Sequence, residues 1–482
     1  ARNKRFNRKL ERQLRLTEML WSCLPCGDYP SEQLEACWKT MLTNQFHDII
    51  PGSSITRVYE DTRKDYERGF ETTDALIADA LKKLTADGSG RNRVTVFNPL
   101  SHTVKTAVRL PNAAGDVLQL GNGGTLPLQR CEDGTSWACL ELKPLQVVHG
   151  TLASGAAAEG AAPAPAVHAE KGVLENELVR YEFDDAGRVV SAFDKQQQRD
   201  FITAEEPGNQ LVLYEDWPVK FDAWDIDMPY PNQLRDRARV STIKVSAAGP
   251  VVGELTVEAD IGISRIKQRI RLAANSKRLD FDTDVDWHEC RKMLRVQFPV
   301  DIRAMEATYE IQFGTLKRPT HENTPWDKAK FEVCGHGFAD LSDNEHGVAL
   351  LNDCKYGYRA KGNTLDMNLL RSPYFPDATA DRGQHTFTYS LLPHNGVLAE
   401  CADVFAEAHV LNQPPVVCPG EVDLQLPFVY AGDGVVLETV KKAERRDAWV
   451  VRLYEPAGKT ASCRLTPDGT GVRVWDAGLM EE

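Results

Sequence analysis

The sequence lacks several features that would indicate particular classes of protein. It has no apolar run of about 18 residues or more, so no segment is expected to span a membrane. It has no basic excess, because 57 Lys and Arg face 70 Asp and Glu, a net charge of −13. Since nucleic acids bind basic surfaces, this charge argues against a nucleic-acid partner. No signal peptide is visible, and 11 cysteines, an odd number, are scattered along the chain, so we expect a cytoplasmic protein.

The length and composition are those of a globular protein with several domains. The chain has 482 residues, of which 42% are hydrophobic and 26% charged. One hydrophobic core stops growing at roughly 250–300 residues, so two to four domains are expected. The sequence leaves a homo-oligomer open.

Two kinds of hydrophobic periodicity divide the chain. Up to residue 90, apolar residues recur at helical spacing and Pro or Gly interrupts them twice, which predicts a three-helix bundle. Beyond Gly90 the period changes to two, which is typical of strands. We therefore predict a multidomain, mainly β protein in which β-sandwich domains follow the bundle. The expected divisions are a bundle at 1–90, a small β domain at 91–152, a linker at 153–167, a large β-sandwich at 168–400 and a C-terminal β domain at 401–482.

One stretch carries most of the chemical information. It runs Asn44-Gln45-Phe46-His47-Asp48-Ile49-Ile50-Pro51-Gly52-Ser53-Ser54-Ile55. We expect the imidazole of His47 and the carboxylate of Asp48 on the last turn of a helix, just before the Pro-Gly break. A neutral imidazole is a good zinc ligand, and a neighbouring carboxylate can bind a sugar hydroxyl. Taken alone, an adjacent His and Asp are more often a solvent-exposed pair or a capping arrangement.

The longer string resembles the α-mannosidases of glycoside hydrolase family 38, in their bacterial and cytosolic-vacuolar branch. The resemblance implies that His47 is a zinc ligand and that Asp48 contacts the mannose ring of a mannose-containing oligosaccharide. It also implies that the large sandwich is of the galactose-mutarotase-like super-sandwich type.

Further segments are similar to the same family. They include 174–181, which looks like the opening strand of the large sandwich, and 214–218, 221–227, 317–324, 351–358, 369–373 and 436–441. The resemblance makes Asp222, Trp224 and Asp225 candidates for substrate binding, with Arg318 and His321 as a second pair. The alternative interpretation for the first group is a packed strand-turn with Trp224 in the core and the acids outside. For Arg318 and His321 it is a surface turn held by local hydrogen bonds.

The sequence lacks a motif that supplies zinc ligands in the resembled family. In the resembled family, a His-x-Asp on a β/α barrel supplies two zinc ligands, and a further Asp is both ligand and nucleophile. No His-x-Asp occurs in this sequence. We therefore expect no catalytic residue in this chain, one zinc ligand, and a partner in its own missing N-terminal barrel. The whole enzyme would carry out retaining hydrolysis with two carboxylates, whereas the isolated chain is expected to be inactive.

Two other functions remain open from the residues. The sandwich could be a non-catalytic carbohydrate-binding module, because Trp217, Trp224, Tyr230 and Trp326 stand near turns and aromatic faces stack on sugars. It could also be a mutarotase-like sugar isomerase, which would need a His and a carboxylate to converge, for example His321 with Asp353.

Overall fold

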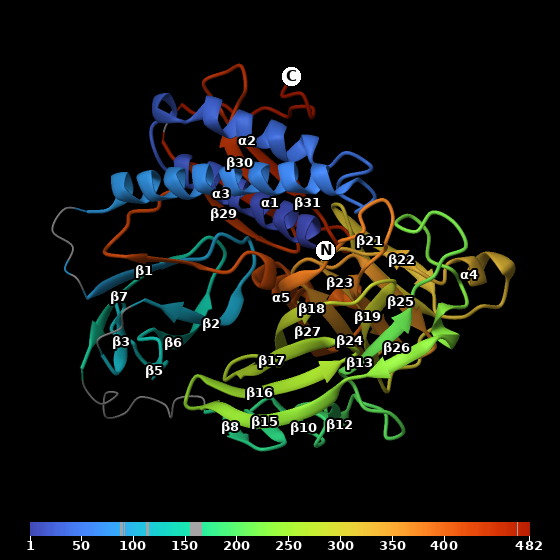
Figure 1. Ribbon diagram of the computed structural model, residues 1–482. Helices are drawn as coiled ribbons and strands as arrows, with labels where there is room; N and C mark the ends of the chain where they lie inside the picture. Colours follow the sequence, from blue (N-terminus) through green and yellow to red (C-terminus); the bar gives the residue numbers. More distant parts are fainter. Residues whose placement is uncertain (87–89, 91, 112–114, 155–165, 470) are drawn as a thin grey trace. The chain divides into compact units, whose positions relative to one another are not determined.

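The computed structural model describes residues 1–86, 90, 92–111, 115–154, 166–469 and 471–482 (Figure 1). Its described part divides into two compact units. Unit 1 comprises Ala1–Phe6, Phe46–Thr62 and Ala162–Asn412, and unit 2 comprises Asn7–Gln45, Arg63–Ala161 and Gln413–Glu482. The predicted linker at 153–167 lies mostly outside the described residues.

The three helices expected at the N-terminal end are present. They are α1 (Arg2–Trp21), α2 (Ser31–Thr43) and α3 (Thr56–Leu84), drawn in blue in Figure 1. Within unit 2, Leu10 of α1 is buried against α3 at Gly69, where an added Cβ would lie 2.7 Å from the leucine Cδ2. Trp21 also donates a hydrogen bond from Nε1 to the Leu76 carbonyl at 3.1 Å. A glycine at the crossing therefore lets the two helices approach closely.

The β part of unit 2 combines strands from distant parts of the chain. One five-stranded sheet has the order β28-β1-β7-β3-β4, and a three-stranded sheet has the order β2-β6-β5. Two pairs, β29-β32 and β30-β31, complete the described strands of this unit. The bounds are β1 (Arg93–Phe97), β2 (Val104–Leu110), β3 (Val117–Leu120), β4 (Thr125–Pro127), β5 (Gln129–Arg130), β6 (Ser136–Leu142), β7 (Val147–Ala153), β28 (Val416–Pro419), β29 (Phe428–Asp433), β30 (Val436–Lys442), β31 (Trp449–Tyr454) and β32 (Ser462–Pro467).

Unit 1 is built on three antiparallel sheets. Their orders are β12-β11-β10-β9-β8, β14-β13-β19-β26-β25-β22 and β15-β16-β17-β18-β27-β24-β23-β20-β21. The bounds are β8 (His168–Glu170), β9 (Val173–Glu175), β10 (Val179–Phe183), β11 (Val189–Asp194), β12 (Arg199–Asp200), β13 (Gln210–Glu215), β14 (Leu234–Arg237), β15 (Arg239–Ala248), β16 (Val252–Ile261), β17 (Ser264–Ala273), β18 (Leu279–Trp287), β19 (Lys292–Pro299), β20 (Glu306–Ile311), β21 (Gly314–Pro319), β22 (Val333–Cys334), β23 (Phe338–Ser342), β24 (His346–Asn352), β25 (Gly357–Lys361), β26 (Thr364–Arg371) and β27 (Gly383–Asn395). The helices α4 (Pro325–Ala329) and α5 (Ala402–Asn412) lie outside these sheets.

The core of unit 1 lies between the two larger sheets. Phe281 of β18 and Tyr389 of β27 stack at 5.0 Å between ring centroids, and Phe298 of β19 packs on them from the six-stranded sheet at 5.7 and 6.3 Å. All three rings are buried. Facing sheets that bury alternate residues form a sandwich, which confirms the predicted mainly β architecture with its helical N-terminal segment.

Two details differ from the sequence-based prediction. The region from residue 401 was expected to be β throughout, but it begins with α5. Its first strand, β28, pairs with β1 of the predicted small β domain, with Val417 opposite Val96. The small and C-terminal β segments therefore share a sheet within unit 2.

A buried acid in the helical segment gives the fold a pH dependence. Glu18 of α1 is 5% exposed, its Oε1 accepts a hydrogen bond from Trp38 Nε1 at 3.1 Å, and burial raises its pKa to about 7. Between about pH 4.5 and 7 the unfolded chain loses this proton while the folded chain keeps it. We therefore expect the free energy of unfolding to fall, by up to about 3 kcal/mol, as the pH rises through this window. Urea unfolding at pH 5 and pH 7.5 measures the change.

The variant Glu18→Gln is the matched control for this prediction. It keeps an oxygen that can accept the Trp38 hydrogen bond but cannot ionise, so this contribution should vanish from its pH profile. If wild type and variant lose stability equally between pH 5 and 7.5, another group causes the dependence.

Candidate functional site

The loop that carries His47 and Asp48 is not the last turn of a helix, as the sequence had suggested. Helix α2 ends at Thr43, and the side chain of Asn44 donates to the Thr40 carbonyl at 3.1 Å. A side chain that takes a helical carbonyl competes with continuation of the helix. A separate turn follows, in which the amides of Ile49 and Ile50 donate to the Phe46 carbonyl at 2.8 and 3.1 Å. The directions of the His47 and Asp48 side chains are therefore set by this turn and not by helix α2.

The two side chains of this pair differ in exposure. The His47 side chain is 77% exposed and the Asp48 side chain 38% exposed, with 3.5 Å between His47 Nε2 and Asp48 Oδ2. The ring of Phe46 lies 4.2 Å from the imidazole between centroids, and Phe46 itself is 56% exposed. His47 therefore presents an accessible imidazole, as a metal ligand must.

The backbone around the pair is held from several directions inside unit 1. Ser53 donates from Oγ to Asp48 Oδ1 at 3.2 Å and from its amide to the Asp48 carbonyl at 3.2 Å. The Tyr59 hydroxyl donates to the same carbonyl at 3.3 Å and accepts the Ser54 amide at 2.7 Å, while burial raises the pKa of Tyr59 to about 12. Lys4 Nζ donates to the Ile50 carbonyl at 2.9 Å. The backbone is thus fixed while the His47 ring stays open to solvent, an arrangement suited to a binding site.

The second group of predicted residues lies on the loop after β13. Trp224 is 47% exposed and Asp225 is exposed, whereas the Asp222 side chain is only 11% exposed. Asp222 Oδ2 accepts the amides of Tyr374 and Phe375 at 2.5 and 2.9 Å. Its carboxylate therefore fixes a neighbouring loop, and a direct contact of Asp222, Trp224 or Asp225 with substrate remains a prediction.

Arg371 is the residue that organises this loop, and the sequence analysis gave it no role. Its guanidinium donates to the carbonyls of Asp222 at 2.9 Å, Ala223 at 3.2 Å and Asp225, and it binds the carboxylate of buried Asp216 at 2.6 Å. A guanidinium presents several fixed donors, so one side chain can hold several carbonyls. The one indication in the sequence was that Arg371 lies in segment 369–373, which is similar to the resembled family.

The remaining predicted pair has local partners. Arg318, at the end of β21, stacks over the Tyr309 ring at 4.7 Å. His321 Nδ1 lies 3.6 Å from Asp327 Oδ2, beside α4, whose first turn is capped by Thr324. In the described part of the chain, no hydrogen bond, ion pair or ring contact joins either residue to the loops of Asp48 or Asp222. Their role in sugar binding stays a prediction.

By contrast, hydrogen bonds link the Asp48 segment to the Asp222 loop within unit 1. Thr56, at the start of α3, donates from its hydroxyl to Asp377 Oδ1 at 2.7 Å. Asp377 follows Phe375 by two residues, and the Phe375 amide is bound by Asp222. The structure therefore connects two of the three predicted groups of site residues.

A zinc ion would need further ligands besides His47. Among the residues that the structure describes, no group of three or more His, Cys, Asp or Glu side chains could hold a metal ion. A catalytic zinc site takes about three protein ligands and an open position. The imidazole of His47 could be one of these protein ligands, but the described residues do not bring the other ligands together around it.

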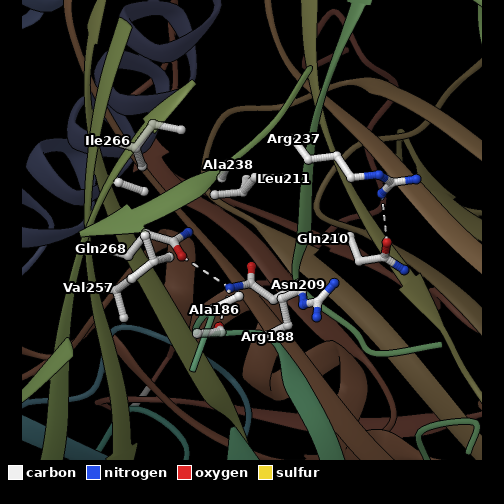
Figure 2. Close-up of a pocket in the computed structure, with 13 residues that line it drawn as sticks. Ala186, Arg188, Asn209, Gln210, Leu211, Arg237, Ala238, Val257, Ile266 and Gln268 are labelled. Carbon is white, nitrogen blue, oxygen red and sulfur yellow. Dashed lines mark hydrogen bonds between the residues drawn. The ribbon is translucent and has the colours of Figure 1, made fainter. Parts of the chain in front are cut away.

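A small cavity inside the sandwich is not a sugar site. It measures about 50 Å³ and is lined by polar side chains, among them Asn209, Gln268, Gln210 and Arg237. Asn209 donates to Gln268 at 3.1 Å and Arg237 donates to Gln210 at 2.9 Å; both hydrogen bonds are drawn in Figure 2. Ligand pockets usually measure about 300–1,000 Å³, so this cavity has room only for a few water molecules.

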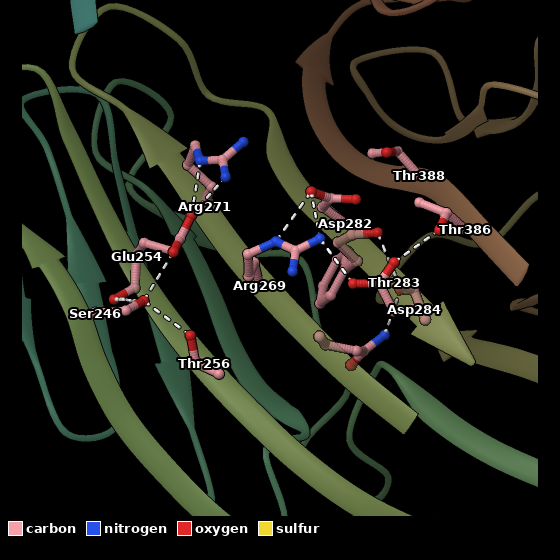
Figure 3. A network of polar contacts seen from close by, with 12 residues as sticks. Ser246, Glu254, Thr256, Arg269, Arg271, Asp282, Thr283, Asp284, Thr386 and Thr388 are labelled. Carbon is pink, nitrogen blue, oxygen red and sulfur yellow. Dashed lines mark hydrogen bonds and ion pairs between the residues drawn. The ribbon is translucent and has the colours of Figure 1, made fainter. Parts of the chain in front are cut away.

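A face of the largest sheet carries rows of opposite charge. Figure 3 shows Arg269 of β17 paired with Asp282 and Asp284 of β18, and Arg271 paired with Glu254 of β16. Both ion pairs of Arg269 measure 3.0 Å. A hollow of about 410 Å³ at one end of this face is lined by further charged residues, including Glu258, Asp260, Arg265, Lys267 and Asp286. Cross-strand pairs of this kind stabilise a solvated sheet. Nothing in their geometry indicates catalysis.

The isomerase alternative gains no support from the contacts. His321 interacts with Asp327, whereas Asp353 Oδ1 accepts the Thr388 amide at 3.1 Å. Concerning membranes, no helix in the described ranges is both long and apolar enough to cross a bilayer.

Comparison with known proteins places the chain in a family. Residues 1–84 match the Alpha mannosidase middle domain, 174–379 the Glycosyl hydrolases family 38 C-terminal domain, and 434–482 the Glycosyl hydrolases family 38 C-terminal beta sandwich domain.

Among similar sequences, Alpha-mannosidase 2C1 of Homo sapiens is 36% identical over 96% of this chain and 44% of its own length. Alpha-mannosidase G of Dictyostelium discoideum is 32% identical over 97% of this chain and 47% of its own length. The chain thus spans about half the length of these relatives.

A solved α-mannosidase from Enterococcus faecalis V583 has a TM-score of 0.78 at 18% identity, covering 97% of this chain and 63% of that one, which supports the fold. The three matched domains and the fold agree with the motif around His47. Together they show that the chain belongs to glycoside hydrolase family 38 and comprises that family's middle and C-terminal domains.

Proposed function

We propose that this chain is the middle and C-terminal part of a zinc-dependent retaining α-mannosidase that hydrolyses terminal α-mannosyl residues of oligosaccharides. The observation that carries the proposal is the loop of Phe46–Ile50, which presents His47 to solvent beside Asp48 on a backbone held by Ser53, Tyr59 and Lys4. In this proposal His47 is one zinc ligand and Asp48 binds a mannose hydroxyl.

The chain contributes binding and positioning in this proposal. The carboxylate of Asp48 accepts a hydrogen bond from a sugar hydroxyl, and Ser53 keeps that carboxylate in place. Zinc, when bound, would act as a Lewis acid toward the mannose hydroxyls. The remaining ligands, the nucleophile and the acid/base would come from an N-terminal barrel, as in the resembled family. The relatives, whose length is about twice that matched here, support this division.

The variant Asp48→Asn in the full-length protein separates the roles of the two neighbours. It keeps the shape and removes a charge-assisted hydrogen bond worth about 1.5–3 kcal/mol, so kcat/KM should fall about ten- to hundredfold. Zinc content should be unchanged, because Asp48 is not expected to bind the metal. Steady-state kinetics on p-nitrophenyl α-mannoside and elemental analysis measure both.

The control for this variant is Asp185→Asn. Asp185 is 96% exposed and pairs with Lys171 at 3.3 Å, so the change should leave kcat/KM and zinc content as they are. Loss of zinc from Asp48→Asn would make Asp48 a ligand. If kcat/KM is unchanged, the assignment of Asp48 to the sugar is wrong.

A further inference from the structure

The end of unit 2 carries a group of exposed apolar side chains. Every residue of 471–480 is exposed, at the red end of the ribbon in Figure 1. The large apolar side chains among them are Val472 at 53%, Val474 at 76%, Trp475 at 67%, Leu479 at 86% and Met480 at 72% exposed. Single exposed apolar residues are common, but a contiguous group indicates an interaction surface. We call residues 472–477 the exposed segment.

The backbone of the exposed segment also lacks partners. Valine and tryptophan favour strands, yet residues 472–477 belong to no helix or strand. Within the described part of the chain, no amide of these residues donates a hydrogen bond to another backbone group. Free backbone donors and acceptors beside exposed apolar side chains form a template on which another strand can pair.

Both ends of the exposed segment are fixed within unit 2. Before it, β32 pairs with β29, with Leu465 opposite Tyr430. After it, the Glu481 carboxylate accepts the Glu444 amide at 2.7 Å and pairs with Lys441 at 3.0 Å, and the Glu481 side chain is only 10% exposed. The exposed segment is thus tethered on both sides, which lowers the entropy lost when a partner binds.

The neighbouring sheet is small. Among the described strands, β32 pairs only with β29, so this sheet has two strands. A two-stranded sheet is marginally stable in water, and further strands or a packed helix usually support it. A strand that pairs with the exposed segment, which follows β32 directly, would add to this part of unit 2. The small sheet and the free backbone therefore favour a strand as the partner.

A second copy of this chain does not suit the exposed segment. In a symmetric antiparallel pair, one residue lies opposite its own copy, because opposite residues point to the same face of the sheet. A pair centred on Val474 places Val472 opposite Asp476, and a pair centred on Trp475 places Val474 opposite Asp476. Centring on Arg473 or Asp476 brings like charges together, which destabilises the pair. The sequence therefore favours a partner strand of different composition.

We propose that the exposed segment binds a β-strand from the part of the whole protein that lies outside this chain. The strand pairs with the backbone of 472–477 and covers Val474 and Trp475 with apolar side chains. In strand addition of this kind, main-chain hydrogen bonds supply affinity and the side chains supply specificity. Because this chain spans only about half the length of its relatives, the whole protein has other segments that can supply the strand. The inference does not rest on the proposed activity.

Hydrogen–deuterium exchange of the amides in 472–477, compared between the isolated chain and the full-length protein, tests the proposal. Paired amides exchange more slowly than free ones, so we expect exchange at least about tenfold slower in the full-length protein. Val474→Asp in the full-length protein should restore the fast exchange, because it would bury an unpaired carboxylate. The control is Met305→Asp, since Met305 is 63% exposed in unit 1, and it should keep the slow exchange. Circular dichroism melts verify that each variant is folded.

Three results would overturn the inference. Fast exchange in both proteins would mean that no strand binds the exposed segment. Slow exchange already in the isolated chain would mean that the segment pairs within this chain or, if the sedimentation mass rises with concentration, with a second copy. Slow exchange that Val474→Asp leaves unchanged would show that the partner does not cover this side chain.

Discussion

Replacing His47 by Ala in the full-length protein is expected to remove most bound zinc and, with it, hydrolysis of α-mannosides. Loss of even an indirect partner of a metal ligand commonly costs about 10–100-fold in metal affinity or activity. Loss of a ligand itself should cost at least about 100-fold. Elemental analysis after dialysis, together with kinetics on p-nitrophenyl α-mannoside, measures both effects.

The stability of the His47→Ala variant should barely change, because the His47 side chain is 77% exposed. The control is His168→Ala, since the His168 side chain is 58% exposed at the edge strand β8 and has no role in the proposed site. If His47→Ala retains stoichiometric zinc, His47 does not bind the metal.

The largest effect on stability is expected from Arg295→Ala. Arg295 is fully buried in β19 and pairs with Asp366 at 2.6 Å and with Glu332 at 2.9 Å. Removing the guanidinium leaves the buried carboxylate of Asp366 and the partly buried carboxylate of Glu332 without this cation. Breaking a buried ion pair in this way costs about 3–5 kcal/mol. For a unit of this size, that corresponds to a fall in melting temperature of roughly 6–20 °C.

Arg269→Ala is the matched control on the charged sheet face. Its ion pairs with Asp282 and Asp284 are partly exposed, so its loss should cost at most about 1 kcal/mol. Thermal unfolding followed by circular dichroism compares the two variants. Equal melting temperatures would show that the buried network contributes no more than a surface pair. Because Tyr230 donates to Glu332, the same network also anchors the end of the loop that carries Trp224.

The sequence predicted the helices and strands whose apolar residues recur at a regular spacing. Helices α1 to α3 were predicted because one face of each repeats at helical spacing, and the strands were predicted because burial alternates. Helix α5 was missed for a physical reason. Val404, Phe405, Ala408 and Val410 are all buried, so its apolar residues are not confined to one stripe.

The pairing of distant strands could not be predicted. Strand β28 joins β1 across more than 300 residues, and no local pattern encodes that register. The end of α2 was misplaced by at least five residues because the side chain of Asn44 takes a helical carbonyl.

At the candidate site, the sequence indicated which segments carry functional residues but not which contacts each residue makes. His47 and Asp48 stand out because the motif is long and specific. Asp222 belongs to a recognisable segment, but its contacts with the amides of Tyr374 and Phe375 depend on a loop about 150 residues away. Arg371 likewise acts through long-range contacts, with the carbonyls of Asp222 and Ala223. Such roles become visible only when the chain is folded.

Whether His47 binds zinc is measured most directly by a crystal structure of the full-length protein with data collected at the zinc absorption edge. We predict one anomalous peak per molecule, about 2.0–2.1 Å from a ring nitrogen of His47, with the remaining zinc ligands outside this chain. A zinc ion bound without His47, or a complete zinc site formed by this chain alone, would contradict it.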